Sequence, residues 1–124
     1  MLREKLKHGF PQAAWETGKE EARQAMIETA RRGGVIAYSD LVKRIEGVRL
    51  EAHDVRLAHM LGEISSEEDE ADRGMLTVVV VHKSGDFRPG PGFFELAKRL
   101  GRDTADLDAC WLAELRRVHE TWAE

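Results

Sequence analysis

The residues best suited to chemistry lie in two places, a predicted helix with His59 and Glu63 and the end of a predicted strand at His82 and Lys83. A helix places residues four positions apart on one face, so His59 and Glu63 should point the same way. With Lys83 or His82 nearby, these groups could form an acid–base or metal-binding cluster. One histidine and one glutamate do not make a metal site without further ligands, and an ordinary polar helix surface is the preferred explanation of these residues.

Cations near the same elements suit a different function, which is binding to the phosphates of double-stranded DNA. The helix predicted at 51–64 and the turn after the strand predicted at 75–81 both carry such cations, and Lys43 and Arg44 could line the same face. Two further residues start the preceding helix, where they could approach the DNA backbone. The predicted DNA-binding residues are Tyr38, Ser39, Arg49, Arg56, His59, Lys83 and Arg88.

The loop PGPGF at 89–93 is a second candidate for ligand binding. Glycines let a ligand approach the backbone, and the free N–H groups at a helix start attract anions. Proline and glycine are also typical of a stiff turn that redirects the chain from a strand to a helix. Glu95 already complements the positive end of the following helix, so the structural interpretation of this loop is preferred.

The elements that position these residues are predicted from apolar periodicity and from residues that start or stop helices. A first helix is predicted to begin at Pro11 and to end at Gly33, with Arg31 and Arg32 in its last turn. Because Gly18 interrupts its early part, the stable part of this helix is expected to begin near Lys19. The acidic run at 65–72 is predicted as a loop or frayed helix end. The other elements are a short strand at 35–38, helices at 39–46 and 51–64, a strand at 75–81, a turn at 83–86, a return strand at 87–88, and helices at 93–100 and 104–122.

This order of elements is typical of a winged helix, in which a helix-turn-helix is combined with a small three-stranded antiparallel sheet. We therefore predict an α+β, winged-helix-like single domain over residues 1–124, with its core at about 12–101 and an extra C-terminal helix at about 104–122. The helix at 51–64 would be the recognition helix, and the residues at 83–88 would form the wing.

Composition narrows the class of protein. The 124 residues are 42% hydrophobic and 34% charged, which is typical of a globular domain with a charged surface. Cys110 is the only cysteine, so no internal disulfide can form, and we expect it to be a small buried side chain in a protein of the reducing cytoplasm. No segment approaches the roughly 20 apolar residues of a membrane span. The N-terminus lacks the apolar core of a signal peptide.

Charge is distributed unevenly along the chain, whose net charge is −4. Residues 1–50 hold ten Lys/Arg and seven Asp/Glu, residues 51–72 hold one and eight, and residues 73–124 hold eight of each. A polyanion would therefore have to approach a single face. The acidic region at 63–72 would instead suit a protein partner.

The last predicted helix carries an apolar line made of Leu107, Trp111, Leu115, Val118 and Trp122. This line is expected to pack against Trp15 and the first helix. The alternative is that it forms the interface of a homodimer through the C-terminal helix.

The segment GVIAYSDLVKRI, followed by RLAHMLGEIS and a strand with a glycine turn, resembles the DNA-binding half of the alkylguanine alkyltransferases and their alkyltransferase-like relatives. The resemblance covers roughly residues 34–100 and implies a winged-helix fold that binds DNA. The Pro-Cys-His-Arg acceptor motif of that family would fall near Val80–Lys83, which reads Val-Val-His-Lys. The acceptor cysteine is absent, so alkyl transfer is not implied.

A second resemblance rests on GML, VVVVHK and PGPGFFELAKRLG, together with the C-terminal Arg-Val-His-x-x-Trp. This combination is similar to small bacterial proteins that have no assigned activity, and it implies a loop of fixed structure. We predict a non-catalytic winged-helix DNA-binding protein of the bacterial cytoplasm, without cofactor or metal. Two alternatives stay open: an adaptor that binds a protein or small ligand with the same fold, and a small enzyme with a His59/Glu63/Lys83 site.

Overall fold

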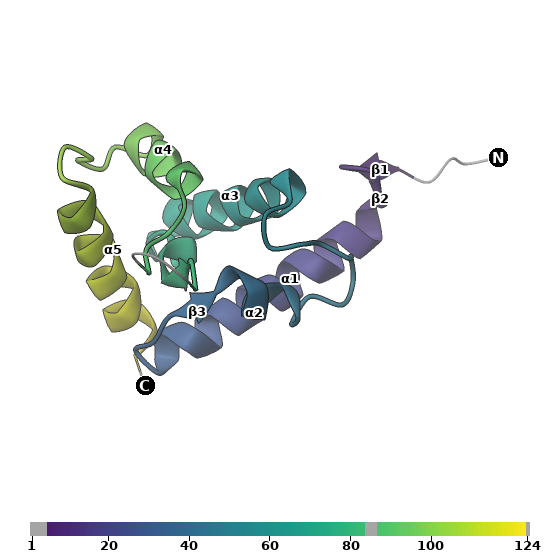
Figure 1. The fold of residues 1–124 in the computed structure, drawn as a ribbon, viewed down its shortest axis with the longest axis horizontal. Helices are drawn as coiled ribbons and strands as arrows, with labels where there is room; N and C mark the ends of the chain where they lie inside the picture. The colour runs from purple at the N-terminus through teal and green to yellow at the C-terminus, as the bar shows by residue number, and fades with distance from the viewer. Residues whose placement is uncertain (1–4, 84–86, 124) are drawn as a thin grey trace.

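The computed structural model describes residues 5–83 and 87–123 of the chain. Within these residues the fold is α+β, with five α-helices arranged around a short central segment (Figure 1). The elements, in chain order, are β1 (Leu6–Lys7), β2 (Phe10–Pro11), α1 (Gln12–Arg31), β3 (Ile36–Ala37), α2 (Tyr38–Val42), α3 (Val55–Glu70), the 3₁₀ helix η1 (Leu76–Val79), β4 (Val80–Val81), α4 (Pro91–Arg99) and α5 (Leu107–Trp122).

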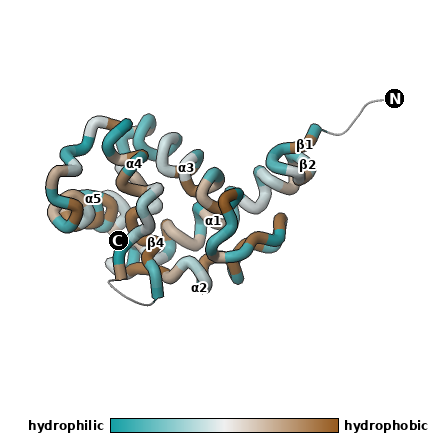
Figure 2. Tube along the Cα trace, turned by 45° about the horizontal axis from the view of Figure 1, so that its top comes forward, coloured by the Kyte–Doolittle hydropathy of each residue, from teal (hydrophilic) through white to brown (hydrophobic). Residues whose placement is uncertain are grey.

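The central segment is residues 75–81, which are buried throughout and pack against α1, α3 and α5. Figure 2 colours β4 and the chain next to it at the hydrophobic end of the scale. Side chains satisfy its backbone: the Met75 N–H donates to Glu114 at 2.8 Å, the Thr77 N–H donates to Ser65 at 3.1 Å, and the Val78 carbonyl accepts from Trp111 at 3.2 Å. With these partners residues 75–79 do not need a neighbouring strand, and only β4 at the end of the segment pairs with one. The strand predicted over 75–81 is therefore wrong except at β4, while the predicted burial of both faces is confirmed.

The predicted three-stranded antiparallel sheet is not present in the described residues. β3 instead pairs with β4 in parallel, with Ile36 opposite Val80 and Ala37 opposite Val81. The predicted return strand at 87–88 makes one backbone hydrogen bond, from the His82 N–H to the Arg88 carbonyl at 3.0 Å. Prolines 89 and 91 cannot donate to a ladder, which prevents further pairing. Most of the predicted turn, residues 84–86, lies outside the described residues.

Helix α1 continues without a break through Gly18. A Cβ atom added to Gly18 would lie 2.9 Å from Val48 and 3.3 Å from Ile45, closer than side-chain contacts tolerate. The glycine therefore allows the chain after α2 to pack closely against α1. The expectation that the stable helix starts near Lys19 is wrong, because this glycine serves packing rather than helix termination.

Helix α3 extends to Glu70 and includes most of the acidic run, which the sequence indicated as a loop or frayed end. Cations from elsewhere in the chain neutralise it. Lys19 donates to Glu67 at 2.9 Å, and Glu68 accepts from Arg23 at 2.9 Å and from Arg73 at 2.6 Å. These partners remove the like-charge repulsion that would otherwise disfavour a helix here.

Other boundaries also differ from the sequence prediction. α2 ends at Val42 rather than at 46, and the N–H groups of Glu46 and Gly47 donate to Glu21 on α1 instead of continuing a helix. α3 begins at Val55, four residues later than predicted. α5 is capped by Asp106, whose carboxylate accepts from the Ala109 N–H at 3.1 Å, and not by Thr104.

The apolar line of α5 faces the core for most of its length. Val118 is fully buried, and Trp111, Leu115 and Trp122 are partly buried against the core, whereas Leu107 is exposed. The expected packing of this line on the core therefore accounts for most of its residues, and a homodimer through the C-terminal helix stays a prediction. Trp15 is buried at the opposite end of α1, where it contacts His8 and Phe10. Cys110 is buried as expected. In the described part of the chain, no helix has both the length and the apolarity needed to cross a membrane.

Candidate nucleic-acid interface

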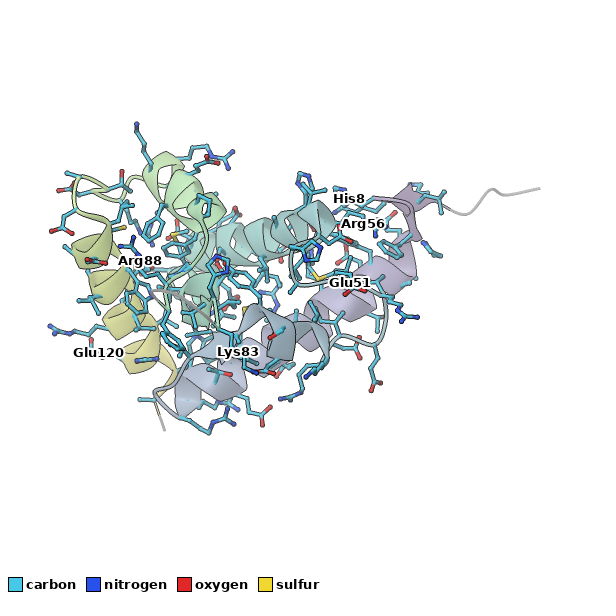
Figure 3. The ribbon with its side chains drawn as sticks, in the orientation of Figure 1. His8, Glu51, Arg56, Lys83, Arg88 and Glu120 are labelled. Atoms are coloured by element: carbon cyan, nitrogen blue, oxygen red, sulfur yellow. The ribbon has the colours of Figure 1, made fainter. Side chains whose placement is uncertain are left out.

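The structure places the predicted DNA-binding residues in two groups, with Arg49 apart from both in the connection between α2 and α3. Figure 3 shows Arg56 beside His8 at one end of the molecule and Lys83 and Arg88 well away from them. Arg49 is exposed in the segment at 43–54, between α2 and α3. The first group contains Arg56 and His59 on α3, and the second contains Tyr38, Ser39, Lys83 and Arg88 around the start of α2 and the end of β4.

The Arg56 side chain is bound by Asp54, the residue that caps the start of the same helix. Its guanidinium donates to both carboxylate oxygens of Asp54, with an Nη2–Oδ2 distance of 2.8 Å, and it lies 4.7 Å from the centre of the Phe10 ring. Hydrogen bonds from the Arg56 side chain and backbone lower the pKa of Asp54 to about 2. An arginine engaged in this way is a poorer phosphate ligand than the sequence indicated, because a phosphate must compete with Asp54.

His59 stays exposed to solvent, but its ring stacks on a residue of an N-terminal hairpin that sequence reasoning missed. β1 and β2 pair antiparallel through a two-residue turn at His8 and Gly9, which have φ values of 53° and 84°. The His8 ring stacks on His59 with 4.8 Å between ring centres and also lies 4.5 Å from the Trp15 ring. The signal available in the sequence was the glycine of this turn, since both central residues of such turns need positive φ.

Glu63 belongs to the same end of the molecule. Its carboxylate accepts from Lys7 at 3.0 Å, from Lys19 at 3.2 Å and from the Trp15 indole at 3.2 Å. Burial alone would raise the pKa of Glu63, but the hydrogen bonds from Trp15, Lys7 and Lys19 lower it below its usual value. A carboxylate held in its charged form by these partners is a structural anion rather than a proton acceptor.

The three groups of the alternative enzyme site do not converge. Glu63 contacts Lys7 and Lys19, and Lys83 instead approaches Asp40 on α2 at 3.9 Å. Over residues 5–83 and 87–123, no three His, Cys, Asp or Glu side chains are arranged to hold a metal ion. This geometry provides no shared pocket for acid–base chemistry.

The acidic region at 63–72 is largely balanced within the molecule. Besides the partners of Glu67 and Glu68, Asp69 accepts from Arg102 at 2.6 Å and Asp72 accepts from Arg117 at 2.8 Å. Glu68 itself is almost completely buried. The region therefore offers a basic partner much less unbalanced negative charge than the sequence indicated.

Tyr38 anchors the PGPGF loop. Its hydroxyl accepts the Gly90 N–H at 3.0 Å, and its ring lies 4.9 Å from that of His82. A Cβ atom on Gly90 would come within 3.3 Å of His82 and 3.5 Å of the Tyr38 hydroxyl. Burial raises the pKa of Tyr38 despite the hydrogen bond from Gly90. These contacts favour the structural interpretation of the loop, and they turn the Tyr38 hydroxyl inward instead of toward a ligand.

Exposed cations gather beside Tyr38, on a surface that we call the α2 face. Asp40 lies 3.8 Å from Lys43 and 3.9 Å from Lys83, and on α1 Glu28 lies 3.6 Å from Arg32 and 2.8 Å from Arg44. The two clusters adjoin because residues 43 and 44 are consecutive. The α2 face consists of the cations Arg32, Lys43, Arg44 and Lys83 and the carboxylates Glu28 and Asp40.

The α2 face carries more positive charge than its carboxylates can balance. Each carboxylate is shared by two cations, so these six ion-paired residues sum to +2, while Glu20 and Glu21 line a hollow together with Arg44. All six side chains are well exposed to solvent. From the sequence, Arg32 was only a cation at a helix end, and its place beside Arg44 follows from the packing of α1 against α2.

Arg88 borders this surface on the side of α5. Its guanidinium donates to Asp108 at 2.6 Å, so it links the chain after β4 to the start of α5.

Comparison of the chain with protein-family models, with characterised proteins and with solved structures gives no match.

Proposed function

We propose that this protein binds DNA without catalysing a reaction, and that it does so through the α2 face in the bacterial cytoplasm. The observation that supports this most directly is the sharing of Glu28 and Asp40 among four exposed cations. An excess of exposed lysine and arginine on one surface is the electrostatic feature by which proteins attract the phosphate backbone.

The ion pairs on this surface do not prevent phosphate binding. Pairs between solvent-exposed side chains contribute little to stability, and their long side chains can be redirected at low cost. The Lys43 and Lys83 contacts with Asp40 are also long, at 3.8 and 3.9 Å. A phosphate that replaces Asp40 as the partner of these lysines would release its counterions, which favours binding at low salt.

The proposal keeps the winged-helix-like interpretation and changes the surface that contacts DNA. The order β3, α2, α3 and β4 supports a helix-turn-helix-like arrangement. DNA is placed on the α2 face and not on the start of α3, because Arg56 makes three hydrogen bonds to Asp54, a carboxylate that is mostly shielded from solvent, whereas the carboxylates of the α2 face are exposed. His59 also stacks on His8. Among the residues predicted from the sequence, Lys83 becomes the principal phosphate contact.

The test is the affinity of the full chain for a fluorescently labelled duplex, measured by anisotropy between about 50 and 200 mM salt. Lys83→Ala and Lys43→Ala should each weaken binding and reduce the slope of log affinity against log salt by about 0.9. Arg56→Ala should change both much less. Lys98→Ala, an equal loss of charge at an exposed position near the end of α4, is the matched control. Absence of binding at low salt, or equal losses for Lys98→Ala and Lys83→Ala, would rule out the proposal.

A further inference from the structure

We infer that Phe87 is a stacking platform for an unpaired base, so that the preferred ligand of this surface is single-stranded DNA or DNA with an unpaired nucleotide. This inference rests on the proposed function and names the class of nucleic acid that the protein selects. It concerns a residue that neither the predicted DNA-binding set nor the α2 face includes.

Phe87 presents an aromatic ring to solvent. Its exposed fraction is 57%, and it is the only strongly exposed Phe, Trp or Tyr side chain within the described residues, 5–83 and 87–123. Its φ of 54° lies in the left-handed region, which bulky side chains rarely adopt. Burial does not explain why this position carries a large apolar side chain, and the backbone conformation would suit glycine better. Such a residue suits contact with a ligand.

The backbone of Phe87 lies near two residues that carry cations, Lys83 and Arg88. The hydrogen bond from the His82 N–H to the Arg88 carbonyl brings the two chain segments together, and Lys83 and Phe87 are the next residues beyond it. Lys83 approaches Asp40 on the α2 face, and Arg88 bonds Asp108 on α5 (Figure 3). The backbone of Phe87 is therefore close to that of Lys83, one of the cations that are proposed to contact phosphates.

This combination of cations and an aromatic ring matches the chemistry by which proteins bind single strands. Cations follow the phosphate backbone while aromatic side chains stack on the exposed faces of bases. In a paired duplex both faces of each base are already stacked on neighbours, so Phe87 has no base face to contact. Duplex binding should then depend on the cations alone, whereas unpaired DNA should use both the cations and Phe87.

The experiment compares three labelled DNAs of equal length: a paired duplex, a duplex with one bulged nucleotide and a single strand. Phe87→Ala should weaken binding to the bulged and single-stranded DNAs by about 5- to 100-fold and should leave duplex binding within about 2-fold. Phe87→Trp should retain the preference. Leu6→Ala, which truncates another strongly exposed apolar side chain on the N-terminal hairpin, is the matched control and should change none of the three affinities.

A direct readout of stacking uses 2-aminopurine at the bulged position. The wild-type chain and Phe87→Trp should quench its fluorescence, and Phe87→Ala should not. Equal losses for all three DNAs, or unchanged affinities with Phe87→Ala, would overturn the inference. If Lys83→Ala still weakens duplex binding in that case, the proposed function survives and only the base-stacking inference fails. If the chain binds none of the three DNAs, the proposed function and the base-stacking inference both fail, and Phe87 would instead be a candidate contact for a protein partner.

Discussion

Replacing Glu114 should destabilise the fold strongly, because this residue joins α5 to the central segment. Glu114 has an exposed fraction of 5%, and its carboxylate accepts from the Met75 N–H at 2.8 Å and from two nitrogens of Arg102 at 2.9 and 3.0 Å. Arg102 is itself mostly buried, and its other carboxylate partner among the described residues is Asp69. Removal of Glu114 therefore leaves a largely buried guanidinium with half of its compensating charge.

The expected magnitude follows from these contacts. Removing one partner of a buried ion pair costs about 3–5 kcal/mol. Glu114→Gln should cost somewhat less, about 2–4 kcal/mol, because its amide oxygen can still accept the Met75 N–H and Asp69 still pairs with Arg102. Glu114→Ala also removes the acceptor of a buried N–H, which adds about 1–3 kcal/mol.

The assay is urea unfolding at neutral pH, followed by tryptophan fluorescence. Glu120→Gln removes the same charge from an exposed position on the same helix and should stay within about 0.5 kcal/mol of wild type. If Glu114→Gln were no more destabilising than Glu120→Gln, the argument from burial and hydrogen bonding would be refuted.

The pH dependence of the same variants tests the charge of Glu114 separately. Burial would raise the pKa of Glu114, but hydrogen bonds from Arg102 and from the Met75 N–H lower it below the usual 4.5. A carboxyl group whose pKa is lowered by folding stabilises the fold above its unfolded pKa, and this contribution is lost as pH falls through its folded pKa. The stability difference between wild type and Glu114→Gln should therefore be constant near neutral pH and shrink below about pH 4.5. A difference that does not change in this range would contradict the assignment.

Two further substitutions test how packing and the PGPGF loop are maintained. Gly18→Ala should destabilise the protein by about 1 kcal/mol or more, although alanine favours helices, because the new Cβ would lie 2.9 Å from Val48. The control is Gly62→Ala in α3, where no atom lies within 4 Å of the added Cβ. This variant should be neutral or stabilising in the same unfolding assay. Tyr38→Phe removes the acceptor of the Gly90 N–H and should cost about 1–2 kcal/mol, with faster hydrogen exchange at the Gly90 amide. Unchanged exchange at that amide would show that Tyr38 does not hold the loop.

The local signals in the sequence located most of the helices. α1 ends before Gly33, whose φ is 66°, and α4 is followed by Gly101, whose φ is 89°, as expected for glycine stops. Most of the predicted apolar positions of α1, α3 and α5 are buried or partly buried, whereas Val55, Ala58 and Leu107 are exposed. The predictions of secondary structure were wrong where one local pattern is compatible with two backbone conformations. The conformation that forms there depends on residues distant in the chain.

Residues 75–81 illustrate the difference. Their β-branched run predicts a strand, and it was correctly expected to be covered on both faces. Whether the chain forms a strand or a 3₁₀ helix depends on what accepts and donates at its backbone, and here Ser65, Trp111 and Glu114 do so from α3 and α5. No local pattern reveals those partners.

The candidate site shows the same division. The sequence by itself determined that cations are scattered near α2 and β4, that Lys83 follows a buried segment, and that the acceptor cysteine of the alkyltransferase pattern is missing. Only the tertiary structure decided which cations remain exposed and unbalanced. It pairs Arg56 with Asp54 and gathers Lys43 and Lys83 around one carboxylate. It also pairs carboxylates of the acidic run with cations of α1 and of the chain after α3. The physical reason is that an ion pair depends on distance in space, which the fold sets, whereas a helix start or stop depends on groups within a few residues of each other in the chain.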